Sequence, residues 1–358
     1  MKKCFLTLVI TVCALTGAGT ARAADVSIYE PYCFTTLAGL ALNSGSTDNT
    51  GSLARFSRPY GVAVDSFGTV YVADTGNHTI RKITSGGVVT LLAGVPGASG
   101  SSDGVNNVAT FSIPTGVAVD SGGNVFVADY NNHLIRQISG GVVTTLAGAV
   151  GLPGSADGTG TAASFWNPFG VAVNSAGTAV YVADQNNQTI RTITVPGGVV
   201  TTLAGSPNVN GSTDGPNNVA LFNTPRGIAV DGSGNVYVAD AGNLKVRKIA
   251  FNGGVSTLAG QLFTPGFNDG QGSGALFSIL QAMNPFGGPC GVAVDSLGNV
   301  YVTAQGNHTI RKITPGDNLN NSVTTLAGSV GLPGSADGTG MAAGFSYPTG
   351  VAVDSAGR

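Results

Sequence analysis

The chain has 358 residues, with 16 Lys and Arg against 18 Asp and Glu, and it contains 56 glycines. The formal charge of −2 disfavours nucleic acid as a partner, because phosphate binding depends on clustered lysine and arginine. The glycine density disfavours long helices, since glycine destabilises a helix interior. No uninterrupted apolar stretch reaches the roughly 18 residues that a membrane-spanning helix requires, so no membrane span is expected.

The first 23 residues have the features of a secretory signal peptide. Lys2 and Lys3 precede an apolar run, and small residues end in Ala21-Arg22-Ala23, which is the order found in export signals. A lipoprotein signal is disfavoured because Val12, before Cys13, is not the small residue that lipidation requires. We therefore expect a secreted, periplasmic or cell-surface protein, cleaved near Ala23, in which residues 24–33 lead into the fold.

A single repeat organises the rest of the chain. Four segments recur in constant order: Gly-Val-Ala-Val-Asp, Asn-Val-Tyr-Val-Ala-Asp, Thr-Ile-Arg-Lys-Ile and Val-Val-Thr-Thr-Leu-Ala-Gly. They are rich in Val, Ile, Thr and Tyr and are separated by Gly, Asn, Asp and Ser, a composition typical of strands and turns. Four short strands in about 50 residues predict the blade of a β-propeller rather than a solenoid. The string Pro-x-Gly-[Val/Ile]-Ala-Val marks the start of each repeat, at Pro59, Pro114, Pro168, Pro225, Pro289 and Pro348.

The two ends of the repeat region predict ring closure. Residues 34–39 resemble an isolated fourth strand, and residues 350–354 resemble an isolated first strand. Together they would form the outer and inner strands of a sixth blade, which hides sheet edges that an open array would expose. The predicted fold is thus an all-β, six-bladed propeller of four-stranded blades over residues 34–358. The chain stops where the second and third strands of the sixth blade would follow, so we expect a C-terminal truncation that leaves residues 34–39 without a neighbouring strand.

An acid and an arginine recur once per repeat, one at the end of the second strand and one on the third. This spacing predicts a carboxylate–guanidinium link that braces each blade. In the fifth repeat Thr303-Ala304-Gln305 replaces the usual Ala-Asp step, so Arg311 is expected to be unpaired. The predicted structural residues are Asp74, Arg81, Asp129, Arg136, Asp184, Arg191, Asp240 and Arg247.

The long loop before each first strand carries the motif Asp-x₅-Ala-x-Phe. Constant spacing in a loop indicates a fixed conformation, in which the Phe fills the seam between blades and the Asp holds the loop backbone. Calcium is the alternative, but a calcium site needs about six oxygen ligands and each loop offers one carboxylate. The six aspartates are Asp48, Asp103, Asp157, Asp214, Asp269 and Asp337.

Three turns between the second and third strands read Asn-His-[Thr/Leu]-Ile-Arg, at His78, His133 and His308. These segments resemble the motif that names the NHL-repeat family of β-propellers. Two repeats depart from it, with Gln188 and Leu244 in place of the histidine. The resemblance covers about residues 34–354 and implies a six-bladed propeller. It implies no single function, because the family includes protein- and RNA-binding modules and a few enzymes.

The ionisable residues give little support for catalysis. Glu30 is the single glutamate after residue 23. The three histidines fall in separate blades, so they cannot converge on one metal ion or form a Ser-His-Asp triad. No catalytic residue, metal ligand or cofactor is therefore assigned. A disulfide between Cys33 and Cys290 is disfavoured, because their repeat positions lie at opposite edges of different blades.

The case for binding rests on positions where the repeats differ. Aromatic and arginine side chains gather around the Pro-x-Gly segments, as in many contact surfaces. Ordinary loop packing is the competing interpretation. We expect an exported, non-enzymatic scaffold that binds a protein or a glycan, with a hydrolase or lyase of a small channel ligand as the alternative. The candidate rim residues are Arg58, Tyr60, Trp166, Phe169, Arg226, Phe286 and Tyr347.

Overall fold

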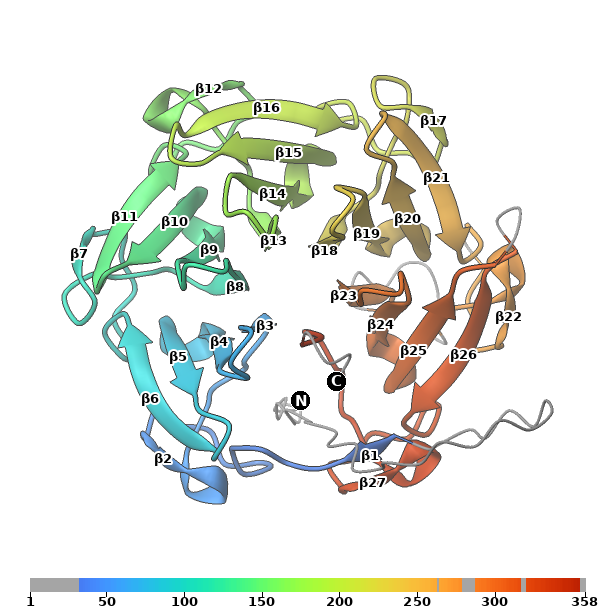
Figure 1. Ribbon diagram of the computed structural model, residues 1–358, viewed down its shortest axis with the longest axis horizontal. Coiled ribbons are helices and arrows are strands. Elements are labelled where there is room, and N and C mark those ends of the chain that lie inside the picture. Colours follow the sequence, from blue (N-terminus) through green and yellow to red (C-terminus); the bar gives the residue numbers. More distant parts are fainter. Residues whose placement is uncertain (1–31, 263, 279–286, 317–319, 355–358) are drawn as a thin grey trace, which may run out of the picture.

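The computed structural model describes residues 32–262, 264–278, 287–316 and 320–354. In this part of the chain, five antiparallel sheets stand around a central channel (Figure 1). The helical segments are single turns of 3₁₀ helix, and no helix of the described residues is long and apolar enough to cross a membrane. The predicted all-β propeller is confirmed. The predicted signal peptide and Phe286 lie outside the described residues.

Each sheet is one blade, and strands that follow one another in sequence are neighbours in the sheet, from the channel outward. We number the blades one to five in chain order. Their strands, from inside to outside, are β3 (Val62–Val64), β4 (Val70–Asp74), β5 (Thr79–Ile83) and β6 (Val88–Ala93); β8 (Pro114–Val119), β9 (Val125–Asp129), β10 (Leu134–Ser139) and β11 (Val142–Ala147); β13 (Pro168–Val173), β14 (Ala179–Asp184), β15 (Thr189–Thr194) and β16 (Val199–Ala204); β18 (Pro225–Val230), β19 (Val236–Asp240), β20 (Lys245–Ile249) and β21 (Gly254–Ala259); β23 (Pro289–Val294), β24 (Val300–Ala304), β25 (Thr309–Thr314) and β26 (Ser322–Ala327).

A fifth strand of two residues lies at the outer edge of every blade, so the sheets have five strands rather than the predicted four. It comes from the loop that precedes the blade and pairs with the fourth strand. A two-residue strand is too short to show the alternating pattern by which strands are recognised in sequence. These strands are β2 (Asn49–Thr50), β7 (Gly104–Val105), β12 (Gly158–Thr159), β17 (Gly215–Pro216) and β22 (Gly270–Gln271).

Single turns of 3₁₀ helix occur at two places in the repeat. One set joins the second and third strands, and the other set lies in the long loop after the two-residue strand. The first set is η2 (Thr75–Asn77), η3 (Tyr130–Asn132), η5 (Gln185–Asn187), η6 (Ala241–Asn243) and η8 (Gln305–Asn307); the second is η1 (Gly51–Leu53), η4 (Gly160–Ala162), η7 (Gly272–Gly274) and η10 (Gly340–Ala342).

The two ends of the described chain lie between blades five and one (Figure 1). β1 (Cys33–Phe34) pairs with β27 (Gly338–Thr339) in a separate two-stranded sheet. The expectation that residues 34–39 would have no neighbouring strand is therefore wrong. The neighbour is β27, which lies in the loop that follows blade five and pairs with Phe34. Residues 350–354 form no strand. The structure thus contains five blades, not the predicted six, together with these terminal segments.

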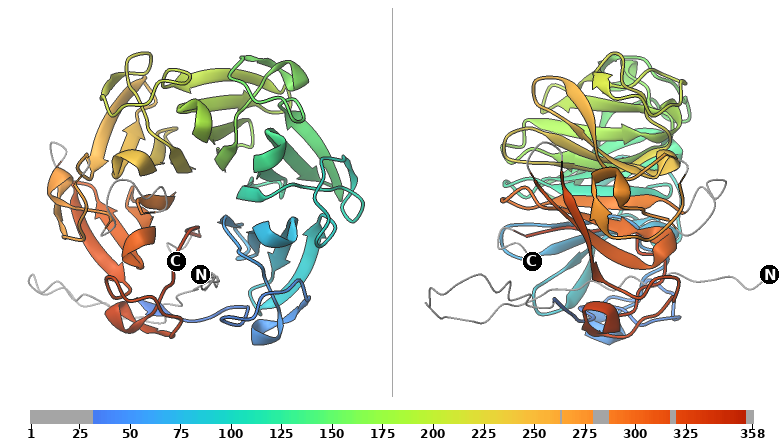
Figure 2. Two further views of the ribbon diagram at one scale, coloured as in Figure 1. Left: turned by 180° about the vertical axis from the view of Figure 1, so that it is seen from behind. Right: turned by 90° about the vertical axis from the view of Figure 1, so that its right-hand side faces the viewer.

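The apolar core is divided into clusters that lie between neighbouring blades. Phe111, for example, packs with Ile80 of blade one and Val127 of blade two. All five residues of the second strand in blade two, β9, are buried, because this strand is covered on both faces by adjacent blades. Burying one large apolar side chain contributes about 1.5–3 kcal/mol, so each loop phenylalanine helps to hold two blades together. The disc that results is seen edge-on in Figure 2.

Candidate functional site at the channel mouth

The first strands approach one another closely around the channel. A Cβ atom added at Gly61 would lie 2.3 Å from the carbonyl oxygen of Thr115, and one at Gly170 would lie 2.2 Å from that of Arg226. The contact continues across the chain ends, since a Cβ at Gly350 would lie 2.4 Å from the oxygen of Tyr60. Only glycine fits such an approach, which explains its place in every Pro-x-Gly segment.

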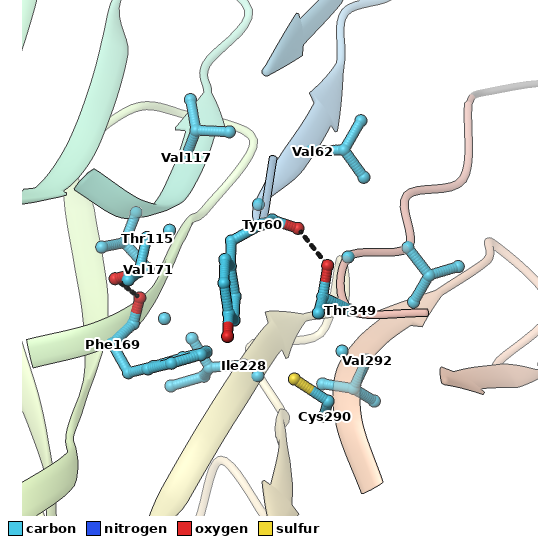
Figure 3. A pocket seen from close by; sticks show the side chains of 17 residues that line it. Tyr60, Val62, Thr115, Val117, Phe169, Val171, Ile228, Cys290, Val292 and Thr349 are labelled. Atoms are coloured by element: carbon cyan, nitrogen blue, oxygen red, sulfur yellow. Dashed lines mark hydrogen bonds between the residues drawn. The ribbon is translucent and has the colours of Figure 1, made fainter. Parts of the chain in front are cut away.

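Five of the side chains at the x position line one pocket between the first strands, and we call this region the channel mouth (Figure 3). The five residues are Tyr60, Thr115, Phe169, Cys290 and Thr349. The rings of Tyr60 and Phe169, from blades one and three, meet edge to face with centroids 5.8 Å apart. Tyr130 of η3, in blade two, also packs edge to face on Phe169, with ring centroids 6.1 Å apart. Edge-to-face contact is a favoured geometry for aromatic pairs, and here it joins three blades.

Arg226 of blade four completes this group. Its guanidinium carbon lies 5.6 Å from the centroid of the Phe169 ring, within the range of a cation–π contact. Its Nη1 donates a hydrogen bond to Oε1 of Gln305, in blade five, at 3.2 Å. Both side chains are buried, each 3% exposed, so the positive charge is held in a fixed position beside the mouth.

Threonines tie the inner segments together by hydrogen bonds. Thr115 donates from Oγ1 to the carbonyl oxygen of Phe169 at 2.7 Å, and Thr349 donates to that of Tyr60 at 3.0 Å. Thr303, one of the departures in repeat five, accepts from the N–H of Gly291 and donates to the carbonyl oxygen of Thr349. These bonds fix the backbone that carries the mouth residues.

A cavity with about 420 Å³ of empty space, part of it open to solvent, lies within the inner strands. Its walls are largely glycine backbone and the aliphatic side chains of Val62, Val117, Val171, Ile228 and Val292. Burial raises the pKa of the Cys290 thiol, which also lines the cavity.

The structure places the predicted rim residues in three different settings. Tyr60 and Phe169 are half-buried at the mouth, whereas Arg226 is buried beneath it. Arg58 and Trp166 are exposed. Tyr347 packs edge to face on His308 with centroids 4.5 Å apart, so it contributes to a contact between blades. Tyr130 and Gln305 were missed by the sequence analysis, although the first residue of this turn varies between the blades: it is Thr75, Tyr130, Gln185, Ala241 or Gln305.

The histidines of the Asn-His turns have a role that the sequence did not reveal. Nδ1 of His133 accepts a hydrogen bond from the N–H of Asn167 at 3.1 Å, so it joins blade two to the loop of blade three. His78 and His308 make the same bond to the next loop, and in blade three Oε1 of Gln188 accepts from Thr224 at 2.6 Å. Burial lowers the pKa of all three histidines, which favours the neutral, accepting form. We call these contacts the blade latches.

Each predicted structural arginine lies between two carboxylates. Arg136 donates to Asp129 at 2.8 Å and to the loop residue Asp103 at 2.6 Å, and its guanidinium carbon lies 5.2 Å from the ring centroid of Phe111. Burial raises the pKa of Asp129 to about 6. The same arrangement joins Arg81 to Asp74 and Asp48, Arg191 to Asp184 and Asp157, and Arg247 to Asp240 and Asp214.

The expectation that Arg311 would be unpaired is wrong. The loop residue Asp269 accepts a hydrogen bond from its Nη2 at 2.7 Å. The loop carboxylate was predicted to hold only the loop backbone, and its additional bond to the arginine could not be read from a separation of about forty residues. Asp269 also accepts from the N–H of Thr325 in the fourth strand at 3.0 Å.

Within the described residues, no group of three or more His, Cys, Asp and Glu side chains is placed to hold a metal ion. Cys33 is exposed, Cys290 is buried, and both are free thiols.

Five sheets around a channel, each built from one copy of a sequence repeat, define the protein as a β-propeller. The NHL repeat family model matches residues 56–83, 111–138 and 222–249. These segments run from the loop phenylalanine to the third strand of blades one, two and four. The chain is therefore a β-propeller that contains NHL repeats in these three blades.

Two curated relatives show the extent of the sequence similarity. Protein SUPPRESSOR OF QUENCHING 1, chloroplastic, of Arabidopsis thaliana is 30% identical over 319 residues, which cover 84% of this chain and 29% of that protein. NHL repeat-containing protein 2 of Homo sapiens is 28% identical over 291 residues, which cover 72% of this chain and 38% of the relative. The chain thus spans less than two fifths of either relative.

A solved structure supports the fold. A structural genomics protein of unknown function from Bacteroides thetaiotaomicron VPI-5482 superposes with a TM-score of 0.66 and 23% sequence identity. The match covers 89% of this chain and 70% of that protein. At this identity the similarity concerns the fold alone.

Proposed function

We propose that the protein is a binding scaffold whose partner site is the channel mouth. The observation that carries this proposal is the convergence of Tyr60, Tyr130 and Phe169, from three blades, beside the fixed charge of Arg226. Clusters of tyrosine, other aromatics and arginine provide most of the binding energy in many interfaces. The mouth therefore has the composition of an anchor site.

Differences between repeats support this location. The residues that recur between blades take part in structural contacts: the arginines bind carboxylates, the loop phenylalanines fill seams, and the histidines of three blades form latches. The x position instead varies from Tyr to Thr, Phe, Arg and Cys. A position that need not be uniform for the fold can be used to recognise a partner.

The partner class that we propose is a protein or a glycan. The cavity beneath the mouth is lined by glycine and aliphatic side chains, with Tyr60, Cys290 and threonines as its polar members. This lining favours binding over the hydrolase or lyase activity that the sequence left open, because acid–base catalysis requires positioned titratable groups.

The two terminal segments occupy, in our proposal, a sixth position of the ring. We place β1 and β27 at the outer edge of a sixth blade and residues 350–353 at its inner edge. The contact of Gly350 with Tyr60 supports the inner position. Thr36 donates to Asp337 at 2.8 Å, as Thr145 donates to Asp103 in blade two, and this supports the outer position. We also propose that the protein is exported, which the signal-like order of residues 1–23 in the sequence supports.

Substitutions on opposite faces of the disc test the site. Tyr60, Tyr130 and Phe169 are changed to Ala together, and the control changes Phe67, Phe251 and Leu297, which are 80–86% exposed in turns at the other ends of the strands. Both variants are compared with the wild-type chain on an array of glycans and on fractionated extracellular proteins. We expect the mouth variant to weaken the dissociation constant of any partner by about 100-fold, since each anchor contributes about 1–2 kcal/mol or more. Unchanged binding by the mouth variant, with loss in the control, contradicts the proposal.

A further inference from the structure

The departures in repeat five change the charge next to the mouth. Ala304 stands where four blades carry a second-strand aspartate, and it pairs with Pro289, the residue before Cys290. The next residue, Gln305, holds Arg226 with an amide oxygen at 3.2 Å. In blades one to four the second-strand aspartate at this position binds the arginine of the third strand. Repeat five thus lacks this carboxylate, and its next residue offers a neutral amide oxygen to the buried Arg226.

A second cation, Arg58, lies near Tyr60. Arg58 is exposed and lies two residues from Tyr60 along the chain. Burial raises the pKa of the Tyr60 hydroxyl, and the charges of Arg226 and Arg58 both act to lower it, so the hydroxyl lies in the field of both guanidinium groups. The nearby aspartates at the ends of the second strands are 0% exposed and bound to their own arginines. The mouth is therefore positive in a chain whose net charge is −2.

Neutral amides border the aromatic group. Nδ2 of Asn167 donates to the carbonyl oxygen of Tyr130 at 3.1 Å, and Nδ2 of Asn186 donates to Oδ1 of Asn167 at 2.9 Å. Both asparagines are half-buried. Aromatic rings offer flat apolar faces to the C–H side of a pyranose, amides exchange hydrogen bonds with hydroxyl groups, and guanidinium groups bind carboxylates in charge-assisted pairs.

We propose that the channel mouth binds a sugar that carries a carboxylate, such as a uronic acid unit of an acidic polysaccharide. This inference rests on the proposed function and names the ligand class for the same site. Arg58 contacts the carboxylate, Arg226 adds a fixed charge, and Tyr60, Tyr130 and Phe169 supply the surface for the ring. An acidic peptide shares the charge but lacks the vicinal hydroxyl groups that suit the two asparagines.

Calorimetric titration of the full chain tests the charge requirement. Trigalacturonic acid is compared with its methyl ester, which has the same rings and no charge, and with a hexaglutamate peptide. We expect the acid to bind, the ester to bind about tenfold more weakly or worse, and added salt to weaken the acid alone. Equal binding of acid and ester, or tighter binding of the peptide, overturns the inference while leaving a partner site at the mouth intact.

Variants locate the carboxylate. Arg58→Gln is expected to weaken binding of trigalacturonic acid about tenfold and to leave binding of the ester unchanged. Arg55→Gln is the matched control, because Arg55 holds the backbone of its own loop at Ser52 and Ala54. Arg226→Gln is measured with its melting curve, since Arg226 is buried. Equal binding by the Arg58 and Arg55 variants overturns the assignment even if the Arg226 variant fails to fold.

Discussion

At the scale of single residues, the histidine of the Asn-His turn acts through its unprotonated nitrogen. Nδ1 can accept the N–H of the next loop only while the imidazole is neutral. The residue that donates, such as Asn167 or Tyr347, lies in the left-handed region with φ of 50–53°. This conformation is rarely adopted by residues other than glycine, so the latch stabilises a backbone that the local sequence does not favour.

The latches predict a dependence of stability on pH. The pKa of each histidine in the folded chain is below its ordinary value of about 6.5, so the unfolded chain binds more protons in this interval. The stabilisation is fully present above about pH 6.5 and is lost as pH falls through the folded-state pKa. Changing His78, His133 and His308 to Gln, the residue that blade three uses, should remove this loss. We expect the free energy of unfolding of the wild type to fall relative to the variant by up to about 1 kcal/mol per latch.

Denaturant unfolding at pH 7.5 and pH 5.5 measures this difference. The second-strand aspartates have pKa values raised to about 6, so their contribution has the opposite sign and decreases as pH rises through about 6. Because both proteins contain these aspartates, the contribution cancels in the comparison. Parallel stability curves for the two proteins would show that the imidazoles do not act as latches.

The latch also shows what residue patterns could predict. The alternation of His and Gln at one position, both able to accept a hydrogen bond, was visible in the sequence, whereas the donor in the next blade was not. The donor is a backbone N–H, which almost every residue type can supply, so the identity of the donating residue does not indicate the bond. Because repeat four has Leu244 at this position, the histidine seemed dispensable in the sequence. In the structure, the side chain of Leu244 has no atom that can accept the hydrogen bond of the latch.

At the scale of the blade, the arginine on the third strand holds three elements together. Arg136 binds Asp129 at the end of β9, Asp103 of the preceding loop, and the carbonyl oxygens of Ser102 and Thr110. The link to the second strand was predicted because both residues recur within one hairpin. The link to the loop was not, because the two residues are 33 positions apart. Contacts between paired strands of one hairpin can be predicted from the sequence, because strand register fixes them. Contacts that depend on the path of a long loop cannot be predicted in this way.

The two carboxylates that bind Arg136 should contribute unequally. Asp129 is buried, and Asp129→Ala would also leave the N–H of Ser112 and the amide of Asn132 without their acceptor. We expect a loss of about 3 kcal/mol in the free energy of unfolding, since removing one partner of a buried ion pair is strongly destabilising and Arg136 would keep only the half-exposed Asp103. Asp103 is 47% exposed, and Asp103→Asn should cost about 1 kcal/mol because water screens this pair. Equal losses in denaturant unfolding would contradict this account of the brace.

At the scale of the whole molecule, the Pro-x-Gly segments occupy six positions around the channel, whereas only five positions carry a blade. Five blades are formed, yet the close contacts run through Gly291 and Thr349 to Gly350 and Tyr60. The repeat predicted that residues 34–39 and residues 350–354 would be the outer and inner strands of one further blade. It could not predict that residues 350–354 would form no strand, because strand formation requires a hydrogen-bonded neighbour and not only a suitable sequence.

Supplying that neighbour provides a test of the six-position ring. A copy of residues 124–138 is joined to the C-terminus, so that it can add second and third strands between residues 350–353 and β1. Its arginine would also reach Asp337, which already accepts from Thr36 as the other loop aspartates accept from their fourth strands. We expect the melting temperature to rise by several degrees, since about 1 kcal/mol corresponds to roughly 2–4 °C for a chain of this size. The same residues in scrambled order serve as the control. If both extensions leave the melting temperature unchanged, the terminal segments are not two edges of one blade.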